Sequence, residues 1–116
     1  MFEKNLEIGY LLDVYGDILP ERRRDMLDLY YNDDLSLAEI AEQMGITRQG
    51  VRECIKKAEA ELFFYEERLG LRRRLREAQK HAETALEACH RAGEIGASVP
   101  PAVTRELEAL ASLLSE

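Results

Sequence analysis

The chain has 116 residues, of which 46% are hydrophobic and 34% are charged, and its formal net charge is −7. This length corresponds to one domain, or one domain with a tail, and the composition is typical of a soluble protein rich in amphipathic helices. No apolar run approaches the roughly 20 residues that span a bilayer, and the acidic balance argues against indiscriminate nucleic-acid binding, because phosphate contacts require Lys and Arg.

The N-terminal segment MFEKNLEIGYLLDVYGD has carboxylates among its apolar residues and no basic region before them, so it does not predict a signal peptide. Cys54 and Cys89 lie far apart and belong to no paired motif. Thiols in a chain without an export signal stay reduced. We therefore expect a cytoplasmic protein with two reduced cysteines and no membrane association.

Helical periodicity indicates two helices before residue 35. Residues 5–16 place Leu6, Tyr10 (with Leu11) and Val14 on one face, and Gly16 is suited to end that helix. Pro20 is suited to the first turn of a second helix, which we expect to run to about Tyr31. The residues of this second helix available for burial are Met26, Leu27, Leu29 and Tyr30.

The segment SLAEIAEQMGITRQGVRECIKKAE, residues 36–59, has the pattern of a helix-turn-helix. Ser36 and Glu39 fit a capping box at the start of its first helix. Ala41 is small where a second helix must cross closely, Gly45 supplies a left-handed turn residue, and Thr47 can cap the next helix. The apolar residues that complete this core are Leu37, Ile40, Met44, Ile46, Val51 and Ile55.

In a DNA-binding helix-turn-helix, the second helix lies in the major groove with its first turns near the base edges. The candidate nucleic-acid-binding residues are Thr47, Arg48, Gln49, Arg52, Lys56 and Lys57. Arg pairs with guanine, Gln pairs with adenine, and lysines and a helix N-terminus favour phosphate. The alternative is that these residues form only the polar face of a helix, and four bases against three acids between residues 36 and 57 leave both interpretations open.

The helix that begins after Thr47 has no breaker before Gly70, and two apolar stripes with heptad spacing meet at that glycine. The first stripe is Val51, Ile55, Ala58, Leu62, Tyr65 and Leu69, and the second is Leu71, Leu75, Ala78, Ala82, Ala85 and Cys89. The step from one to the other rotates the stripe by about 200°, which predicts a break or sharp bend at Gly70.

Residues 93–101, GEIGASVPP, predict a linker before a last helix from about Ala102. The apolar residues of that helix are Val103, Leu107, Leu110 and Leu114. Three apolar stripes exceed what one short domain covers by itself. We therefore predict a homodimer formed through the stripes in 51–69 and 71–89.

A basic collar follows Gly70 in the sequence LRRRLREAQK, in which six bases and one acid fall between Arg68 and Lys80. Its arginines, which are candidates for accessory contacts with a nucleic-acid backbone, are Arg72, Arg73, Arg74 and Arg76. The alternative is a solvated helix start balanced by neighbouring glutamates.

Enzyme chemistry finds no support in the sequence. Gly70 stands alone rather than in a phosphate-binding loop, and Asp33 and Asp34 read as a turn. His81 and His90 are nine residues apart, which places them on opposite sides of a helix. We expect no catalytic site, no cofactor and no metal.

The stretch MLDLYYNDDLSLAEIAEQMGITRQGVRECIKKAEAELFFYEERLGL resembles the YlxM family of small bacterial proteins, whose fold is similar to region 4 of sigma factors. The resemblance continues upstream through LEIGYLLDVYGDILPERRRDML and covers about residues 5–71. It implies a DNA-binding helix-turn-helix regulator. Because the family's genes lie beside those of the signal recognition particle GTPase and its receptor, it also implies a role in that pathway, through the particle's RNA or through either protein. Arg52 stands where the family commonly has an aromatic residue, and Gly50 where it has alanine.

Together these features predict an all-α protein with a sigma-region-4-like helix-turn-helix domain at residues 1–70 and a helical extension at residues 71–116. Two functions follow from them. One is a nucleic-acid-binding regulator. The other is a protein-binding or RNA-binding adaptor of the signal recognition particle machinery that does not bind DNA.

Overall fold

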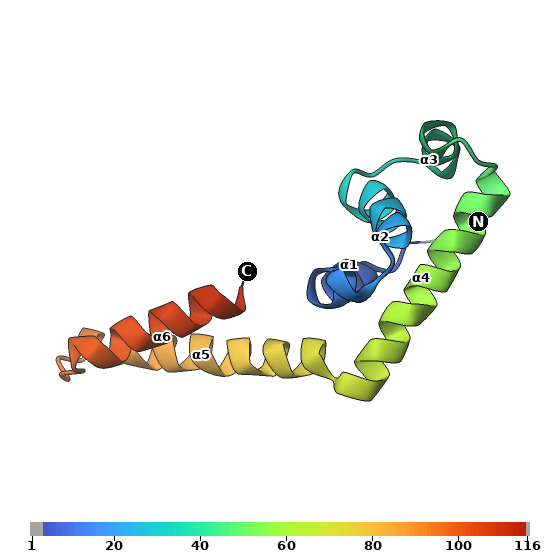
Figure 1. Ribbon diagram of the computed structural model, residues 1–116. Coiled ribbons are helices and arrows are strands. Elements are labelled where there is room, and N and C mark those ends of the chain that lie inside the picture. The colour runs from blue at the N-terminus through green and yellow to red at the C-terminus, as the bar shows by residue number, and fades with distance from the viewer. Residues whose placement is uncertain (1–3, 116) are drawn as a thin grey trace. The chain divides into compact units, whose positions relative to one another are not determined.

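The computed structural model describes residues 4–115, so Met1, Phe2, Glu3 and Glu116 lie outside the described residues. The first three residues of the N-terminal segment MFEKNLEIGYLLDVYGD are therefore not described. Within 4–115 the regular structure is entirely helical, in six α-helices with two short turns of 3-10 and π-helix (Figure 1). The expected all-α class is confirmed. The chain divides into an N-terminal unit that ends at Arg72 and a C-terminal unit that begins at Arg73.

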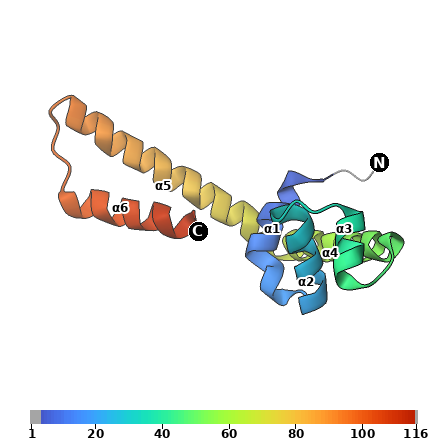
Figure 2. The same cartoon turned by 90° about the horizontal axis from the view of Figure 1, so that it is seen from above.

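The N-terminal unit places three helices against one long helix. The three are α1 (Leu6–Tyr15), α2 (Glu21–Leu27) and α3 (Leu37–Met44), and each contacts α4 (Arg48–Leu69). A 3-10 turn at Gly16–Ile18 follows α1, and a π-helical turn at Asp28–Asn32 extends α2. Figure 2 shows the four helices gathered into one compact group.

The core of this unit is built on the predicted stripe of α4. Val51, Ile55, Ala58 and Leu62 are fully buried. The residues that cover them include Ile8, Leu11, Tyr15, Met26, Leu27 and Ile40, from α1, α2 and α3. Each of the large side chains contributes about 1.5–3 kcal/mol by leaving water. The stripe predicted to pair two copies is therefore covered by the chain's own helices as far as Leu62.

The predicted apolar face of α1 was partly right, because Leu11 is buried and Val14 packs partly buried against the core. Leu6 is 83% exposed and Tyr10 is 51% exposed, whereas Ile8, Leu11, Leu12 and Tyr15 are buried. Apolar residues occupy both sides of this ten-residue helix, and only the set at 8, 11, 12 and 15 presents an unbroken i, i+3, i+4, i+7 stripe of large side chains to α4.

The predicted turn chemistry is confirmed at both ends of α3. The Ser36 hydroxyl accepts a hydrogen bond from the Glu39 N–H at 3.1 Å, and the Glu39 carboxylate accepts one from the Ser36 N–H at 3.1 Å. Gly45 ends the helix with φ 69°, in the left-handed region. The Thr47 hydroxyl then accepts from the Gly50 N–H at 3.0 Å and caps α4. Helices α3 and α4 thus form a helix-turn-helix.

The predicted break at Gly70 is also confirmed, since Gly70 has φ 62° and α5 (Leu71–Glu94) begins at the next residue. The first N–H groups of α5 are satisfied from the N-terminal unit. The Tyr15 hydroxyl accepts from the Leu71 N–H at 3.0 Å and donates to Glu66 at 2.7 Å, and the same carboxylate oxygen accepts from the Arg72 N–H at 2.9 Å. Burial, and then Glu66, raises the pKa of Tyr15.

The C-terminal unit is a helical hairpin in which α6 (Pro101–Leu114) runs back along α5 (Figures 1 and 2). The predicted face of α6 is partly right. Leu107 and Leu114 are partly buried, but Val103 and Leu110 are 45% and 43% exposed. The small residues Thr104 and Ala111 lie at the covered positions of α6 instead, where they permit close approach of a neighbouring helix.

Candidate nucleic-acid interface

The first turns of α4 present an outward polar face because their other face is locked in the core. Val51 and Ile55 are fully buried, so the residues on the opposite side point to solvent. Of the predicted site residues, Arg48, Gln49, Arg52 and Lys56 are exposed. At about 100° per residue they fall within a sector of roughly 100°. The fold therefore brings four of the six predicted contact residues onto one surface, which we call the α4 face.

Thr47 lies at the start of the α4 face and serves first as a cap. Its hydroxyl oxygen accepts from Gly50, and its own proton remains able to donate to an acceptor such as phosphate. A Cβ on residue 50 would lie 3.2 Å from the Thr47 Oγ1, so glycine relieves this close approach. Gly50 thus keeps the cap compact at the point where a helix N-terminus attracts anions.

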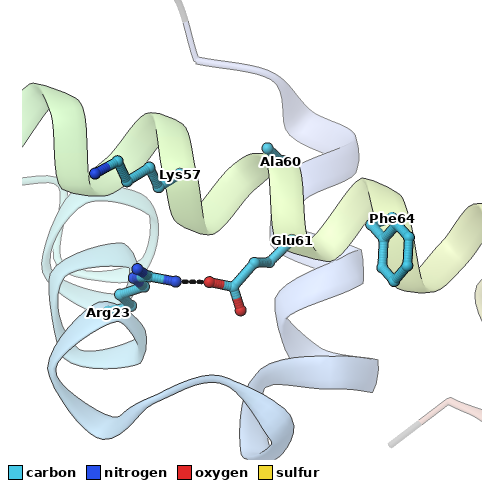
Figure 3. Close-up of a pocket in the computed structure, with 5 residues that line it drawn as sticks. All are labelled: Arg23, Lys57, Ala60, Glu61 and Phe64. Atoms are coloured by element: carbon cyan, nitrogen blue, oxygen red, sulfur yellow. Dashed lines mark ion pairs between the residues drawn. The ribbon is translucent and has the colours of Figure 1, made fainter.

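Lys57 lies apart from the other five residues. It points from the flank of α4 that faces α2 and lines a shallow depression of about 330 Å³ with Arg23, Ala60, Glu61 and Phe64. Figure 3 shows Arg23 of α2 directed at Glu61 of α4, with which it forms an ion pair. The depression is therefore a second surface.

All of the positively charged side chains of the helix-turn-helix lie on α4. The α4 face carries three cations, but Glu53 lies at its edge and its carboxylate accepts a hydrogen bond from the Gln49 amide at 3.3 Å. Helix α3, which crosses the backbone when such a motif docks on DNA, contains no lysine or arginine and exposes Glu39 and Glu42. Phosphate contacts from α3 would have to come from neutral donors, such as the side-chain amide of Gln43 or backbone N–H groups.

The basic collar is divided between the two units. The Arg72 side chain is only 16% exposed, its guanidinium lies 4.0 Å from the centre of the Tyr10 ring, and its Nε lies 3.6 Å from a Glu7 carboxylate oxygen. Arg72 thus packs on α1. Arg73, Arg74 and Arg76 are exposed on α5 and belong to the C-terminal unit.

Sequence reasoning did not predict the depression that the Phe64 ring lines. Phe63 and Phe64 are 43% and 50% exposed, and the Arg68 guanidinium lies 4.9 Å from the centre of the Phe64 ring. A helical wheel carries the missing signal, because both phenylalanines lie off the stripe defined by Val51, Ile55, Ala58 and Leu62.

Between residues 4 and 115 no group of three His, Cys, Asp or Glu side chains is arranged to hold a metal ion. Over the same range no helix has both the length and the apolar character to cross a membrane. Cys54 and Cys89 are free, and Cys54 packs partly buried against the core.

Residues 2–94 of the chain match the family UPF0122, described as "Putative helix-turn-helix protein, YlxM / p13 like". The chain belongs to the UPF0122 family. This confirms the resemblance noted in the sequence. The family is described by its helix-turn-helix, and α3 and α4 form that motif in this chain.

Several relatives of the chain carry the UPF0122 name. The UPF0122 protein of Clostridium kluyveri is 49% identical over 69 residues, which are 60% of this chain and 62% of that protein. The UPF0122 protein of Desulforamulus reducens is 52% identical over 65 residues, 56% of each chain, and that of Bacillus cereus strain AH187 is 45% identical over 80 residues, 69% of this chain and 73% of the relative. The chain thus spans about three fifths of the length of the first two relatives. The family match ends at Glu94, where α5 ends, so α6 lies outside it.

Proposed function

We propose that this protein is a DNA-binding helix-turn-helix regulator that reads the major groove with the α4 face. The observation that carries the proposal is the capped start of α4, where the core holds one side of the helix and Arg48, Arg52 and Lys56 share the other. Arg48, Gln49 and Arg52 are nearest the base edges, Lys56 meets phosphate, and the Thr47 hydroxyl meets phosphate at the helix N-terminus.

The salt dependence of the proposed binding is modest, because few cations contribute to it. The slope of log K against log salt reaches about −2.7 only where Arg48 and Arg52 neutralise phosphates as well as Lys56, and the binding constant then falls roughly 40-fold between about 50 and 200 mM. Arg73, Arg74 and Arg76 add to this slope if they touch the backbone of the same nucleic acid. We leave Arg72 out of this set, because its guanidinium packs on Tyr10 and Glu7.

The test is a titration of the full chain against duplex DNA and against signal recognition particle RNA at several salt concentrations. We expect the triple change Arg48→Ala, Arg52→Ala and Lys56→Ala to weaken binding and to flatten the slope by about 0.9 for Lys56 alone and by at most about 2.7 for all three cations. The matched control removes three exposed cations elsewhere, through Arg22→Ala, Lys80→Ala and Arg105→Ala. Binding by the first variant with an unaltered salt slope contradicts the proposal.

A second candidate function is an adaptor in the signal recognition particle pathway that contacts the GTPase or its receptor. The acidic surface of α3 and the net charge of −7 favour it, since both suit a protein partner better than a polyanion. Purified pathway proteins that retain the chain after nuclease treatment support the adaptor. Loss of the complex under that treatment counts against it.

The proposed regulator acts in the cytoplasm as a homodimer. Two-fold symmetric helix-turn-helix proteins place two recognition helices about 34–36 Å apart on successive turns of DNA. Light scattering of the full chain tests this, and a monomer mass across micromolar concentrations contradicts it. Since the chain's own helices cover α4 from Val51 to Leu62, a pairing surface has to lie elsewhere.

A further inference from the structure

The C-terminal hairpin lacks a core of its own. Between residues 71 and 115, Ala82 is the one buried residue. Two helices cover only one flank of each other, and short helices in water depend on packing of their apolar faces for stability. A hairpin with a single buried alanine therefore leaves much of its packing surface open.

Helix α6 carries two adjacent apolar stripes, and only one of them is covered. The partly buried positions are Thr104, Leu107, Ala111 and Leu114. The second stripe is formed by Val103, Leu110 and Leu113, which are 45%, 43% and 65% exposed. Their spacings of seven and three place them on one side of the helix, roughly 100° from the covered stripe. A helix with two apolar flanks is typical of a four-helix bundle, where each helix has two neighbours.

Helix α5 adds an uncovered apolar end. With 24 residues against the 14 of α6, α5 is longer by about 15 Å at 1.5 Å per residue. Leu75 and Ala78 lie in the N-terminal turns of α5 and are both exposed, Leu75 by 39%. An occupant of the hairpin thus meets apolar side chains from both helices.

The order of charges along α5 indicates which partner helix can pack against the hairpin. Residues 73–80 hold four bases and one acid, whereas residues 83–94 hold three acids and one base, and that base, Arg91, is paired with Glu87. A second α5 laid antiparallel brings the basic half of each copy against the acidic half of the other. A parallel arrangement brings like charges together.

From the unpartnered stripe and this charge order, we infer that residues 73–116 are a self-association surface on which a second copy docks antiparallel, so that two hairpins form a four-helix bundle. Leu75, Val103, Leu110 and Leu113 of each copy are buried in the joint core. The inference rests on the proposed homodimer and names its surface. That surface shares no residue with the α4 face, and α6 lies outside the residues that match the family.

The first experiment is sedimentation equilibrium of the full chain across micromolar concentrations, with circular dichroism to follow helicity. The expected native species is a dimer, and the double change Leu110→Asp and Leu113→Asp weakens dimerisation on the order of 100-fold. The matched control is Leu6→Asp with Ile18→Asp, two exposed apolar residues of the N-terminal unit, and it leaves the dimer unchanged. A dimer that survives the change at Leu110 and Leu113 overturns this surface while the homodimer stands.

The second experiment tests the antiparallel order. Arg73→Glu, Arg74→Glu and Arg76→Glu in one protein, and Glu83→Lys, Glu87→Lys and Glu94→Lys in another, are each expected to abolish self-association, and an equimolar mixture restores a dimer. Added sodium chloride weakens the native dimer, because its charge pairs attract. A native dimer that strengthens with salt overturns the antiparallel order.

Two outcomes separate this inference from the proposed function. A native chain that is monomeric throughout overturns the inference, and it leaves DNA binding by the α4 face to its own titration. The native chain can instead be a monomer that binds a purified pathway protein, with binding lost when Leu110 and Leu113 are changed. That outcome shows that the hairpin binds the pathway protein, and it overturns self-association.

Discussion

At the turn of the helix-turn-helix, Gly45 has φ 69°, which a residue with a Cβ adopts at a cost of about 1–2 kcal/mol. A Cβ at this position would meet no heavy atom within 4 Å, so space is not the reason for glycine there. Asp34 holds a similar conformation with φ 56° and forms an ion pair with Lys4, which lowers the pKa of its carboxyl group. Backbone conformation at single residues thus sets how the chain enters and leaves α3.

We expect Gly45→Ala to lower the free energy of unfolding by about 1–2 kcal/mol through backbone strain alone. Gly45→Asn costs less, because asparagine tolerates the left-handed region. Urea denaturation measures both. The control is Gly9→Ala in α1, where a Cβ also meets nothing within 4 Å and alanine stabilises the helix by about 0.5–1 kcal/mol. Equal effects at the two glycines would contradict the assignment.

The raised pKa values of Tyr15 and Tyr31 predict how the free energy of unfolding depends on pH. Burial, and then the carboxylate that each hydroxyl contacts, raises the pKa of Tyr15 beside Glu66 and of Tyr31 beside Glu59. The unfolded chain releases these protons near the ordinary pKa of 10.0, before the folded chain does. Their contribution is therefore fully present below pH 10 and is lost as the pH rises through the folded values. Chemical denaturation above pH 10 should show a smaller loss for Tyr31→Phe than for the native chain, and equal losses refute this.

At the scale of elements, α4 has two roles on two faces. Its buried stripe holds α1, α2 and α3 together, and its opposite face carries the candidate contacts. The capping box of α3 and the Thr47 cap of α4 fix the start of each helix. The position of the α4 face is thus set by core packing more than by the charged residues themselves.

The two faces of α4 can be separated by mutation. We expect Ile55→Ala to lower the free energy of unfolding by about 2–5 kcal/mol, because it leaves a cavity in the core. Nucleic-acid affinity per folded molecule stays unchanged. Arg52→Ala gives the converse, with weaker binding and a change in unfolding free energy within about 0.5 kcal/mol. Denaturation and titration of both variants check this, and a binding loss in Ile55→Ala at full folding contradicts it.

At the scale of the whole molecule, the chain consists of a unit with a full core and a unit with almost none. We propose these as the two domains, with the boundary close to Arg72. In the N-terminal unit, Tyr15 and Glu66 accept hydrogen bonds from the backbone N–H groups of Leu71 and Arg72, at the start of α5. The C-terminal hairpin depends on what it packs against.

We expect a chain truncated after Arg72 to unfold cooperatively and to keep the charged residues of the α4 face folded. Residues 73–116 in isolation should lose helicity on dilution, because their packing depends on association. Circular dichroism at several concentrations measures both fragments. A hairpin fragment whose helicity is independent of concentration contradicts this, as does a truncated chain that fails to fold.

Local chemistry made much of the fold predictable. Helix caps and helix ends depend on the backbone and on nearest neighbours in the sequence, so a short stretch of sequence is enough to predict them. This applies to the Ser36–Glu39 capping box, Gly45, Thr47 and Gly70. The same holds for the stripe of α4, whose spacing is that of a helix packed on one side. The four clustered contact residues follow from this stripe, because they lie outside it on the helix surface.

What sequence alone could not decide is which of several apolar or charged faces finds a partner. On α1 two faces compete, and packing on α4 chose Ile8 and Tyr15 over Leu6 and Tyr10. Arg72 is not part of the exposed basic collar, because its side chain packs on Tyr10 and Glu7. Lys57 is not part of the α4 face, because it lines the depression next to Arg23.

By itself, the sequence of this UPF0122 protein determined an all-α chain, a capped helix-turn-helix and a break at Gly70, because those depend on contacts between residues close in the chain. Only the tertiary structure decided that the Val51–Leu62 stripe belongs to an internal core and that the stripe of Val103, Leu110 and Leu113 stays open. Burial is a property of what packs against a face, and those packing partners lie tens of residues away along the chain.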